Sequence, residues 1–387
     1  MSSGNGAVAG APATPPILFN ALLTLNAVPG LAHAPRVAGV QVTHLRDIGV
    51  GEGRHEVFLG LDHQINAELV FKRIRKEALA SRDAFFAEAR RLYESRHRHV
   101  VPIAYACEDA APVYLAMPHF ARGSLQALLE QRCLSTREIV RLGLDFRMGL
   151  HHAHVRGVLH FDVKPTNVFL DDAGAATLAD FGQSRLADPG GLADTPPMYP
   201  RHVPPEAYTG TQLTRRADVY QAGLTLYRMC VGAAAWDAQA GPFGKHLSPP
   251  LHDAVLQGRF PDRNAFPEHI PTRLRTLVTK ALRPDPDKRW PTVLDLMNQL
   301  ATVSGGDDLD WRPQVDGSGG MSWELTSQRA TKRVALGRNS SGTDWRVEVT
   351  RLGLTPGAKP SRLKTECLGP ASEAAARAHA RKLLGVS

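Results

Sequence analysis

Cysteine and long apolar runs are both scarce in this sequence. The 387 residues contain four cysteines, which lie far apart and form no CxxC pair: Cys107, Cys133, Cys230 and Cys367. This spacing excludes a zinc knuckle and argues against a secreted disulfide framework, so we expect a reducing, cytoplasmic setting. No apolar run approaches the roughly 20 residues of a membrane-spanning helix. The apolar stretch within 17–34 lacks a preceding basic region, so we expect no signal peptide, no membrane contact and a soluble protein.

Charge gives little guidance to function. The chain has 46 basic and 38 acidic residues, which gives a formal charge of +8. This excess could attract acidic partners, but it identifies no site, and we do not expect a specific nucleic-acid role. With 43% hydrophobic and 22% charged residues, a folded core is expected. The length exceeds that of one ordinary domain and predicts two folded units.

Changes of composition along the chain divide it into four regions. The first sixteen residues are mostly glycine, alanine, serine and proline, which cannot offset the entropy of ordering a backbone. Strand-like runs begin near Val42, and the stretch SGGDD at 304–308 precedes a second alternating pattern. We predict a disordered or extended segment, a larger domain, a linker and a small strand-rich domain ending in a helix: 1–41, 42–303, 304–320 and 321–387.

The larger domain has two different halves. Between 42 and 117, short apolar runs and polar turns surround one helical pattern at 83–95. From 121 to 303 the patterns are mainly helical. We therefore predict an α+β fold with a small β-rich N-terminal lobe at 42–117 and a large helical C-terminal lobe at 121–303.

Two motifs carry side chains suited to phosphoryl transfer: HFDVKPTNVFL (160–170) and ADFG (179–182). This reaction depends on positioning, on cations across the phosphates and on a carboxylate that orients the attacking hydroxyl. Asp162 is the candidate base, and Lys164 can reach the γ-phosphate. Asn167 and Asp180 are hard oxygen ligands suited to Mg²⁺ or Mn²⁺. A DFG tripeptide alone would more simply indicate a β-turn.

The order and spacing of these motifs resemble those of the eukaryotic-type, or Hanks-type, protein serine/threonine kinases over roughly 44–302. The resemblance implies a two-lobed kinase fold that binds ATP with a divalent metal. Lys72 in ELVFKRI is similar to the family's strand lysine. Glu88 in FFAEARRL is similar to the helix glutamate that holds this lysine toward the α- and β-phosphates. Lys164 implies a serine or threonine acceptor, because tyrosine-directed relatives lack lysine at this point of the loop.

The resemblance also implies a nucleotide site. Met117 would be the gatekeeper, and the backbone near His119 would face the adenine edge. Val57, Val70 and Phe169 would enclose the adenine ring. Each of these residues alone is more typical of a hydrophobic core than of a cofactor contact.

Two supporting contacts are implied further along the chain. The motif PPE at 204–206 resembles the end of an activation segment, and Arg289 in DPDKRW resembles the arginine that pairs with its glutamate, Glu206. The stretch ADVYQAGLTLY resembles the helix whose aspartate, here Asp218, braces the catalytic loop.

The glycine-rich loop departs from the family pattern. Counting back from Val57, none of the three family positions holds glycine. Three glycines lie close by instead: Gly49, Gly51 and Gly53. Either the turn is shifted and its backbone amides still approach phosphate, or the loop is degenerate and binds ATP weakly.

A second departure concerns regulation. Phe161 stands where many relatives carry an arginine that pairs with a phosphorylated residue of the activation segment. The segment 183–206 is rich in glycine and proline, and it contains one threonine, Thr195, and one tyrosine, Tyr199. Without the arginine a phosphate has no obvious partner, so we expect a non-RD kinase that is not switched by phosphorylation of this segment.

The C-terminal region resembles no family that we recognise. Strands are predicted at 322–326, 333–337, 344–352 and 361–368, followed by a helix over 372–384. Trp345, Val347 and Val349 alternate with polar residues, which predicts that they share one buried face of their strand. Ser372 can cap this helix and Gly385 can end it. A nucleic-acid-binding fold, a protein-interaction module and a support for the kinase lobe all remain open.

The sequence therefore predicts a protein serine/threonine kinase that uses ATP and Mg²⁺ or Mn²⁺ to phosphorylate a protein substrate. The main alternative is a pseudokinase, an ATP-binding scaffold that has lost turnover through its degenerate glycine loop. A nucleic-acid-binding protein with an incidental kinase fold rests only on the positive charge. The sequence does not define the substrate, the regulatory signal or the oligomeric state.

Overall fold

The computed structural model describes residues 17–19, 39–50, 55–79, 81–94, 96–244, 246, 248–315, 320–339 and 342–386. The chain forms two compact units: Met1–His97 with Val101–His119, and Arg98–Val100 with Phe120–Ser387. Most of the segment predicted to be disordered or extended, 1–41, lies outside the described residues. Among the helices that are described, none combines the length and apolar character needed to cross a membrane.

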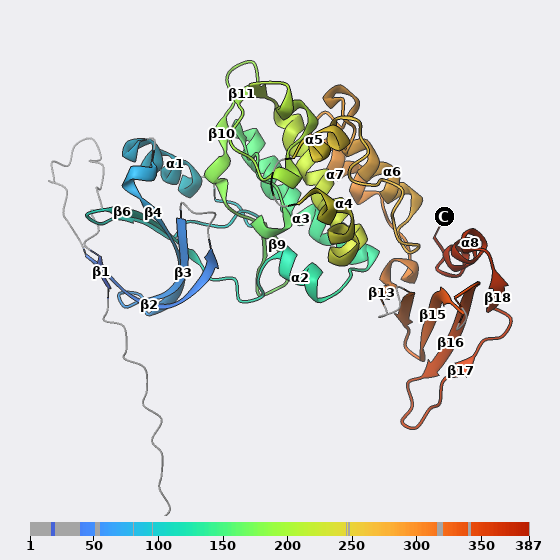
Figure 1. Ribbon diagram of the computed structural model, residues 1–387. Coiled ribbons are helices and arrows are strands. Elements are labelled where there is room, and N and C mark those ends of the chain that lie inside the picture. The colour runs from blue at the N-terminus through green and yellow to red at the C-terminus, as the bar shows by residue number, and fades with distance from the viewer. Residues whose placement is uncertain are drawn as a thin grey trace, which may run out of the picture. The chain divides into compact units, whose positions relative to one another are not determined.

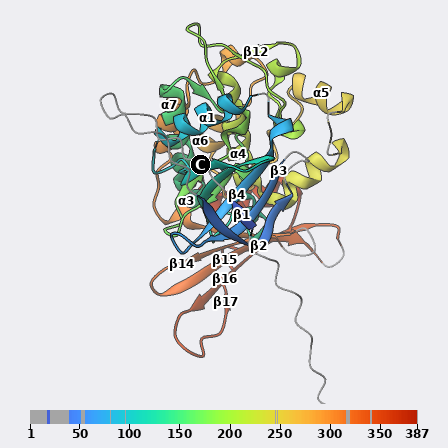
Figure 2. The same ribbon diagram turned by 90° about the vertical axis from the view of Figure 1, so that its left-hand side faces the viewer.

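The first unit is built on one antiparallel sheet with the strand order β1-β2-β3-β4-β6-β5, drawn in blue to green in Figures 1 and 2. Its strands are β1 (Ile17–Phe19), β2 (Val40–Val50), β3 (His55–Asp62), β4 (Ala67–Arg75), β5 (Tyr105–Glu108) and β6 (Pro112–Pro118). The unit also contains a 3-10 turn, η1 (Lys76–Ala78), and one helix, α1 (Arg82–Glu94).

Alternation along β4 gives the sheet two different faces. Leu69 and Phe71 are buried, and the Phe71 ring stacks on Phe58 of β3 with ring centroids 5.3 Å apart. Val70 and Lys72, one residue along in each case, lie half-buried on the opposite face. One face of the sheet therefore carries the hydrophobic core, and the other carries residues that the sequence assigned to nucleotide binding.

The second unit begins with a helical region, as the sequence predicted. Its helices are α2 (Leu125–Gln131), α3 (Thr136–Val155), α4 (Arg215–Ala240), α5 (Pro249–Leu256), α6 (Thr272–Ala281) and α7 (Val293–Ala301). Ser135 and Glu138 form a capping box at the start of α3. The α4 helix is interrupted at Gly232, where φ is +80°, a conformation that glycine adopts without strain. The predicted α+β class, with a β-rich region followed by a helical one, is confirmed.

Short strand pairs and 3-10 turns fold the loops between these helices. The strand pairs are β7 (Val158–Leu159) with β10 (Arg185–Leu186), β8 (Val168–Leu170) with β9 (Ala176–Leu178), and β11 (Ala193–Asp194) with β12 (Gln212–Leu213). The 3-10 turns are η2 (Pro165–Asn167), η3 (Phe181–Gln183), η4 (Pro200–His202), η5 (Pro205–Tyr208), η6 (Gly241–Phe243), η7 (Pro286–Lys288) and η8 (Asp307–Asp310). The pairs β8–β9 and β7–β10 frame the catalytic loop.

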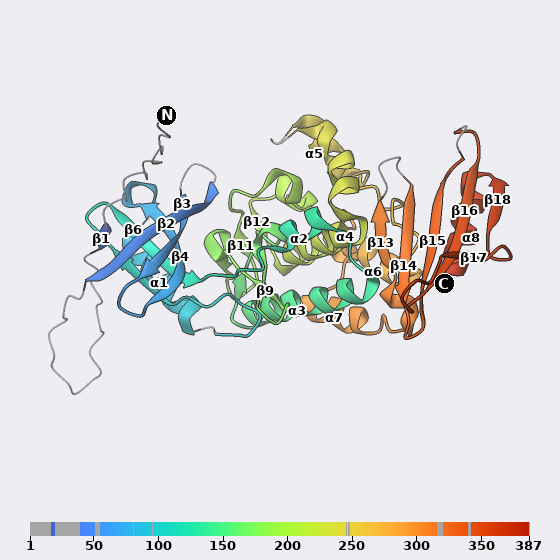
Figure 3. The same ribbon diagram turned by 90° about the horizontal axis from the view of Figure 1, so that it is seen from below.

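The end of the chain forms an antiparallel sheet with one helix, α8, beside it (Figure 3). Its elements are β13 (Arg312–Val315), β14 (Met321–Thr326), β15 (Ala330–Arg338), β16 (Trp345–Gly353), β17 (Ser361–Arg362), β18 (Leu368–Ala371) and α8 (Glu373–Leu383). Val347 and Val349 are fully buried, as the alternating pattern predicted, whereas Trp345 of the same pattern is only half-buried. Ser372 accepts a hydrogen bond from the Ala375 N–H at the start of α8.

Two features of this sheet differ from the prediction. Strand β13 lies in the segment 304–320, which the sequence analysis described as a linker. The strand predicted at 361–368 is broken after Arg362 by a turn in which the Glu366 N–H bonds the Leu363 carbonyl. Pairing of these short strands depends on neighbours distant in sequence, so their local composition gives little signal.

Buried polar contacts connect this sheet to the helical region. The Trp323 indole N–H donates to Nδ1 of His269 at 3.1 Å, and both side chains are buried. Arg377 of α8 forms a 2.7 Å ion pair with Glu268, whose side chain is fully buried. The division into two domains near 304 remains a prediction, since the C-terminal sheet has its own core around Trp323 and also these contacts.

Candidate active site

Asp218 of α4 holds the start of the catalytic loop. Its Oδ2 accepts the backbone N–H of His160 at 2.8 Å, and its Oδ1 accepts that of Phe161 at 2.7 Å. The His154 ring contacts the same carboxylate at 2.7 Å. Burial alone would raise the pKa of Asp218, but the hydrogen bonds from His154 and the loop backbone hold it below its ordinary value. The predicted brace of the catalytic loop is therefore present as a buried carboxylate.

Phe161 lies at a strained point of the loop. Its φ of +60° is uncommon for a residue with a Cβ, and its side chain is fully buried. The Phe161 carbonyl accepts the Gln221 amide at 3.0 Å, while the Gln221 oxygen accepts the Val163 N–H at 2.9 Å. Strain of this kind persists only where neighbours over-determine the backbone, and here Asp218 and Gln221 do so.

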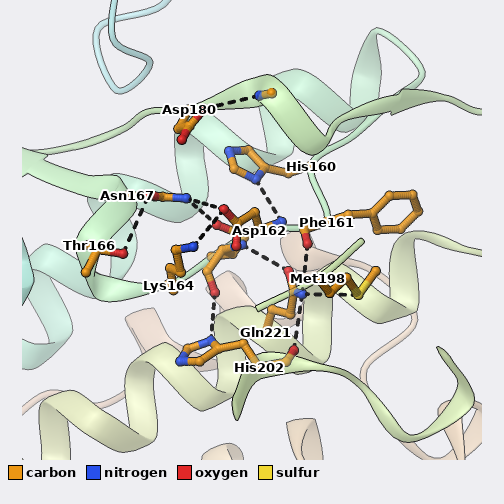
Figure 4. A network of polar contacts seen from close by, with 12 residues as sticks. His160, Phe161, Asp162, Lys164, Thr166, Asn167, Asp180, Met198, His202 and Gln221 are labelled. Carbon is orange, nitrogen blue, oxygen red and sulfur yellow. Dashed lines mark hydrogen bonds and ion pairs between the residues drawn. The ribbon is translucent and has the colours of Figure 1, made fainter. Parts of the chain in front are cut away.

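The two carboxylate oxygens of Asp162 have different surroundings (Figure 4). Oδ2 lies 2.9 Å from the Lys164 ammonium and accepts the Asn167 amide at 2.7 Å. Oδ1 is buried and has no hydrogen-bond partner among the described residues. A buried acceptor without a partner is costly, so its presence in this loop indicates a group that awaits a donor. The arrangement holds one oxygen of Asp162 and leaves the other without a hydrogen bond to the described residues.

Asn167 and Asp180 supply oxygens beside this carboxylate. Figure 4 shows Asp180 on the same side of Asp162 as the Asn167 amide. The backbone of Asp180 is left-handed, with φ of +59°, and its Oδ1 accepts the Gly182 N–H at 3.3 Å. One carboxylate and one amide oxygen form a donor set that Mg²⁺ prefers, with water and phosphate oxygens completing such a shell. These residues therefore fit a magnesium ion.

His160 connects the catalytic loop to the DFG segment. Burial lowers the pKa of His160, so its ring is neutral near pH 7. Its Nε2 donates to the Ala179 carbonyl at 3.1 Å, and its Nδ1 accepts the Asp162 N–H at 3.2 Å. The Phe181 ring lies against it, with ring centroids 4.5 Å apart. This contact fixes Phe181, which follows Asp180, against His160, which lies two residues before Asp162.

Two residues of the activation segment touch the catalytic loop, and neither contact is predicted by the sequence. The Lys164 ammonium lies 5.0 Å from the centre of the Tyr199 ring. The fully buried His202 donates from Nδ1 to the Val163 carbonyl at 3.2 Å and accepts the Arg228 guanidinium at 3.1 Å. Burial, and then the Arg228 charge, lower the pKa of His202 well below its ordinary value. From the sequence, Tyr199 is only a candidate phosphorylation site, and neither residue stands in a pattern that marks such a contact.

The ion pair predicted at the end of this segment is present. Arg289 donates to both carboxylate oxygens of Glu206, at 2.7 and 2.6 Å. The guanidinium is fully buried, and it also donates to the carbonyls of Arg216 and Pro284. A bidentate pair with this many satisfied donors fixes the end of the segment firmly.

In the first unit, the strand register gathers the predicted nucleotide residues on one face of the sheet. Lys72 pairs with Val57 on one side and with Leu115 on the other. Val70, two residues earlier on the same face, pairs with Met117. These five side chains are half-buried, unlike the buried core on the opposite face of the sheet. In the described part of the sheet, this face therefore carries the Lys72 ammonium beside apolar side chains.

The remaining predicted residues fall in separate places. His119 Nδ1 lies 3.9 Å from the Glu68 carboxylate in the first unit. Phe169 of β8 lies in the second unit, with its ring centroid 5.8 Å from that of Phe120. Gly49 pairs with Val57 after an irregularity in β2. Two glycines, and the side chain of the predicted helix glutamate, lie outside the described residues: Gly51, Gly53 and Glu88.

Comparison with known proteins places this geometry in context. The model of the protein kinase domain family matches residues 42–300. The serine/threonine-protein kinase PknD of Chlamydia caviae is 28% identical over 305 residues, which are 70% of this chain and 32% of the relative. The serine/threonine-protein kinase PknK of Mycobacterium tuberculosis H37Rv is 30% identical over 219 residues, which are 54% of this chain and 19% of the relative. The chain thus spans less than a third of the length of these relatives.

Proposed function

Because the chain belongs to the Hanks-type protein kinase family, we propose that it transfers the γ-phosphate of ATP to serine or threonine hydroxyls of a protein substrate. The observation that carries this proposal is the unequal pair of Asp162 oxygens. Oδ2 is held by Lys164 and Asn167, and Oδ1 is left without a partner in the described residues. Such a carboxylate can accept the hydrogen of a hydroxyl that attacks phosphorus.

The chain's own residues act mainly by positioning. Asp162 Oδ1 receives the acceptor hydroxyl and points its oxygen toward the phosphate. The Lys164 ammonium, already bonded to Asp162, offers its other hydrogens to an oxygen of the transferred group. Asn167 and Asp180 would hold Mg²⁺ or Mn²⁺, which neutralises phosphate charge when bound. Lys72, on the half-buried face of the first sheet, would bind the α- and β-phosphates.

The preference for serine and threonine rests on Lys164 and on the names of the relatives. We also propose a kinase of the non-RD type, whose activity does not need phosphorylation of the activation segment. In place of a phosphate bound to an arginine, the His202 and Tyr199 contacts hold the segment to the catalytic loop. The four cysteines are free, which fits the proposed cytoplasmic location.

The test is transfer of radiolabelled phosphate from ATP by the full chain, followed by identification of the phosphorylated amino acid. Asp162→Ala should lower the rate about a thousandfold, within the range of a lost general base, and leave nucleotide affinity nearly unchanged. Asp180→Ala should also abolish the metal-dependent part of nucleotide binding, measured by calorimetry with and without Mg²⁺.

The pseudokinase alternative is favoured by the shifted glycine positions, and the same assay separates it. Wild-type transfer that does not exceed the Asp162→Ala background with either Mg²⁺ or Mn²⁺ would establish a scaffold. Transfer exclusively to tyrosine would instead contradict the proposed acceptor.

A further inference from the structure

A cavity of about 500 Å³ lies away from the catalytic loop, where α6 and the segment before it meet α8. Five of its lining residues are basic: Arg263, Arg275, Lys280, Arg283 and Arg381. The other lining residues are uncharged, and none is acidic. Arg381 comes from the C-terminal helix and the other four from the helical region, so both parts of the unit contribute to this basic pocket.

The five basic side chains of the pocket form no ion pair with a carboxylate in the described part of the chain. Arg275 donates to the carbonyls of Ile270 and Pro267, at 2.7 and 3.0 Å. Lys280 lies over the Trp290 ring, 3.7 Å from its centre. The Nε of Arg381 is buried and has no hydrogen-bond partner among the described residues. This pattern contrasts with the bidentate carboxylate pair of Arg289 in the same unit.

The buried carboxylate of Glu268 does not compensate these charges fully. Glu268 attracts Arg275, but it is already bound to Arg377 at 2.7 Å. Burial lowers the pKa of Arg275, and repulsion from Arg381 lowers it further. Gathering like charges around a partly desolvated cavity costs free energy that a bound anion would recover.

We propose that the basic pocket binds a small anion that carries two or more phosphoryl groups. Its volume lies in the range of small-molecule sites and exceeds what a single phosphate fills. Guanidinium groups match phosphate oxygens with two parallel hydrogen bonds, and four of the five cations are arginines. Because the pocket is lined from both α6 and α8, the anion would also tie the C-terminal sheet and helix to the helical region.

The test uses the full chain and inorganic pyrophosphate in isothermal titration calorimetry. Arg283, just after α6, is exposed and Arg381 of α8 is half-buried, so the double variant Arg283→Gln/Arg381→Gln removes one donor from each of two parts of the pocket lining. Its affinity should fall about tenfold or more, since one charge-assisted hydrogen bond contributes roughly that factor. The control is Arg273→Gln, an exposed arginine of α6 outside the pocket lining, whose affinity should stay at the wild-type value.

Several results would overturn the proposal. One is that pyrophosphate does not bind the wild type saturably. Another is that the wild type, the double variant and Arg273→Gln bind it with equal affinity. A third is that Arg273→Gln loses as much affinity as the double variant. Inorganic phosphate that binds as tightly as pyrophosphate would refute the requirement for two phosphoryl groups. Should the double variant melt below the wild type without ligand, Arg283→Gln alone decides, because its exposed side chain contributes little to folding.

The source of the anion is distinguished with vesicles. Phosphatidylcholine vesicles with and without phosphatidylinositol bisphosphate are sedimented with the wild type and with the double variant. Co-sedimentation that needs the bisphosphate and is lost in the double variant assigns the pocket to a lipid headgroup. Binding of pyrophosphate without co-sedimentation assigns it to a free phosphate compound.

Discussion

Asp218 and Glu268 are both fully buried carboxylates of the second unit, but their partners differ. Asp218 accepts two backbone N–H groups and the His154 ring, and both of its oxygens are bonded. Glu268 is paired with Arg377 through one oxygen, while its Oε2 is buried without a hydrogen bond in the described residues. The start of the catalytic loop is thus held by one carboxylate that makes three hydrogen bonds, whereas the Glu268 carboxylate at the junction with the C-terminal sheet makes one ion pair.

Removal of the Asp218 carboxylate should have the largest effect on stability. Asp218→Ala should lower the free energy of unfolding by about 4 kcal/mol, because two loop N–H groups and a histidine lose their common acceptor. Chemical denaturation measures the loss. Asp237→Ala, at an exposed position of the same α4 helix, is the matched control and should change it by less than about 0.5 kcal/mol. A loss below about 1 kcal/mol at Asp218 would mean that the brace is dispensable.

Acid should weaken the junction next. Burial lowers the pKa of His269 to about 4, from an ordinary 6.5, while its Nε2 donates to Leu134 and its Nδ1 accepts from Trp323. The buried neutral ring of His269 therefore contributes its full stabilisation above pH 6.5. As the pH falls from 6.5 toward 4, the free energy of unfolding should decrease by roughly 3 kcal/mol in all. Thermal melting across this range measures it.

His269→Gln serves as the comparison for the acid effect, because glutamine can accept and donate but does not titrate. Other buried histidines remain in both proteins and cancel in the difference. The variant should show a shallower decline of the melting temperature between pH 6.5 and 4. Parallel declines in the two proteins would exclude His269 as the source.

Breaking the ion pair at the junction should cost about 2 kcal/mol. Arg377→Gln leaves the Glu268 carboxylate buried without its cation, and most of the lost stability comes from this unpaired buried charge. Chemical denaturation of this variant is compared with Lys382→Gln, an exposed change of the same charge on α8. The double change Glu268→Gln/Arg377→Gln should recover part of the loss. If the double variant is no more stable than Arg377→Gln alone, the loss in Arg377→Gln does not come from the unpaired Glu268 charge.

The smallest effect is expected at Tyr199, where one ring faces one ammonium. Tyr199→Ala should lower kcat/KM about fivefold, because a contact of this kind contributes roughly 1 kcal/mol to holding Lys164. Tyr199→Phe keeps the ring and should retain nearly all activity. Thr195→Ala, in the same segment, is the control. Equal losses in the phenylalanine and alanine variants would assign the effect to the hydroxyl instead.

The sequence predicted those parts of the molecule that stand in ordered motifs or simple periodicities. The Asp218 brace and the Glu206–Arg289 pair followed from the resemblance, and the alternation at Val347 and Val349 followed from the period of a strand. Contacts without a local pattern were missed. Trp323 and His269 lie 54 residues apart, and Arg377 and Glu268 lie 109 apart, and nothing in either neighbourhood marks the partner.

The basic pocket and the left-handed backbone of Phe161 also escaped prediction, for a related reason. Positive φ at a phenylalanine opposes local preference, and it exists here because Gln221 and Asp218 bind the backbone on either side. The cations of the pocket are spread over 263–381. In the sequence they are indistinguishable from ordinary surface charges, because only the fold brings them together.

The hydrogen bonds of the Gln221 side chain affect how this region unfolds locally. Its amide touches the carbonyls of Phe161 and His202, and its oxygen takes the Val163 N–H, so one buried side chain joins the catalytic loop to the activation segment. The Gln221 side chain cannot move away from one segment without also losing its hydrogen bonds to the other. In hydrogen–deuterium exchange, the Val163 and His202 amides should therefore become labelled in a single cooperative event, and the two segments would behave as one unit of local unfolding.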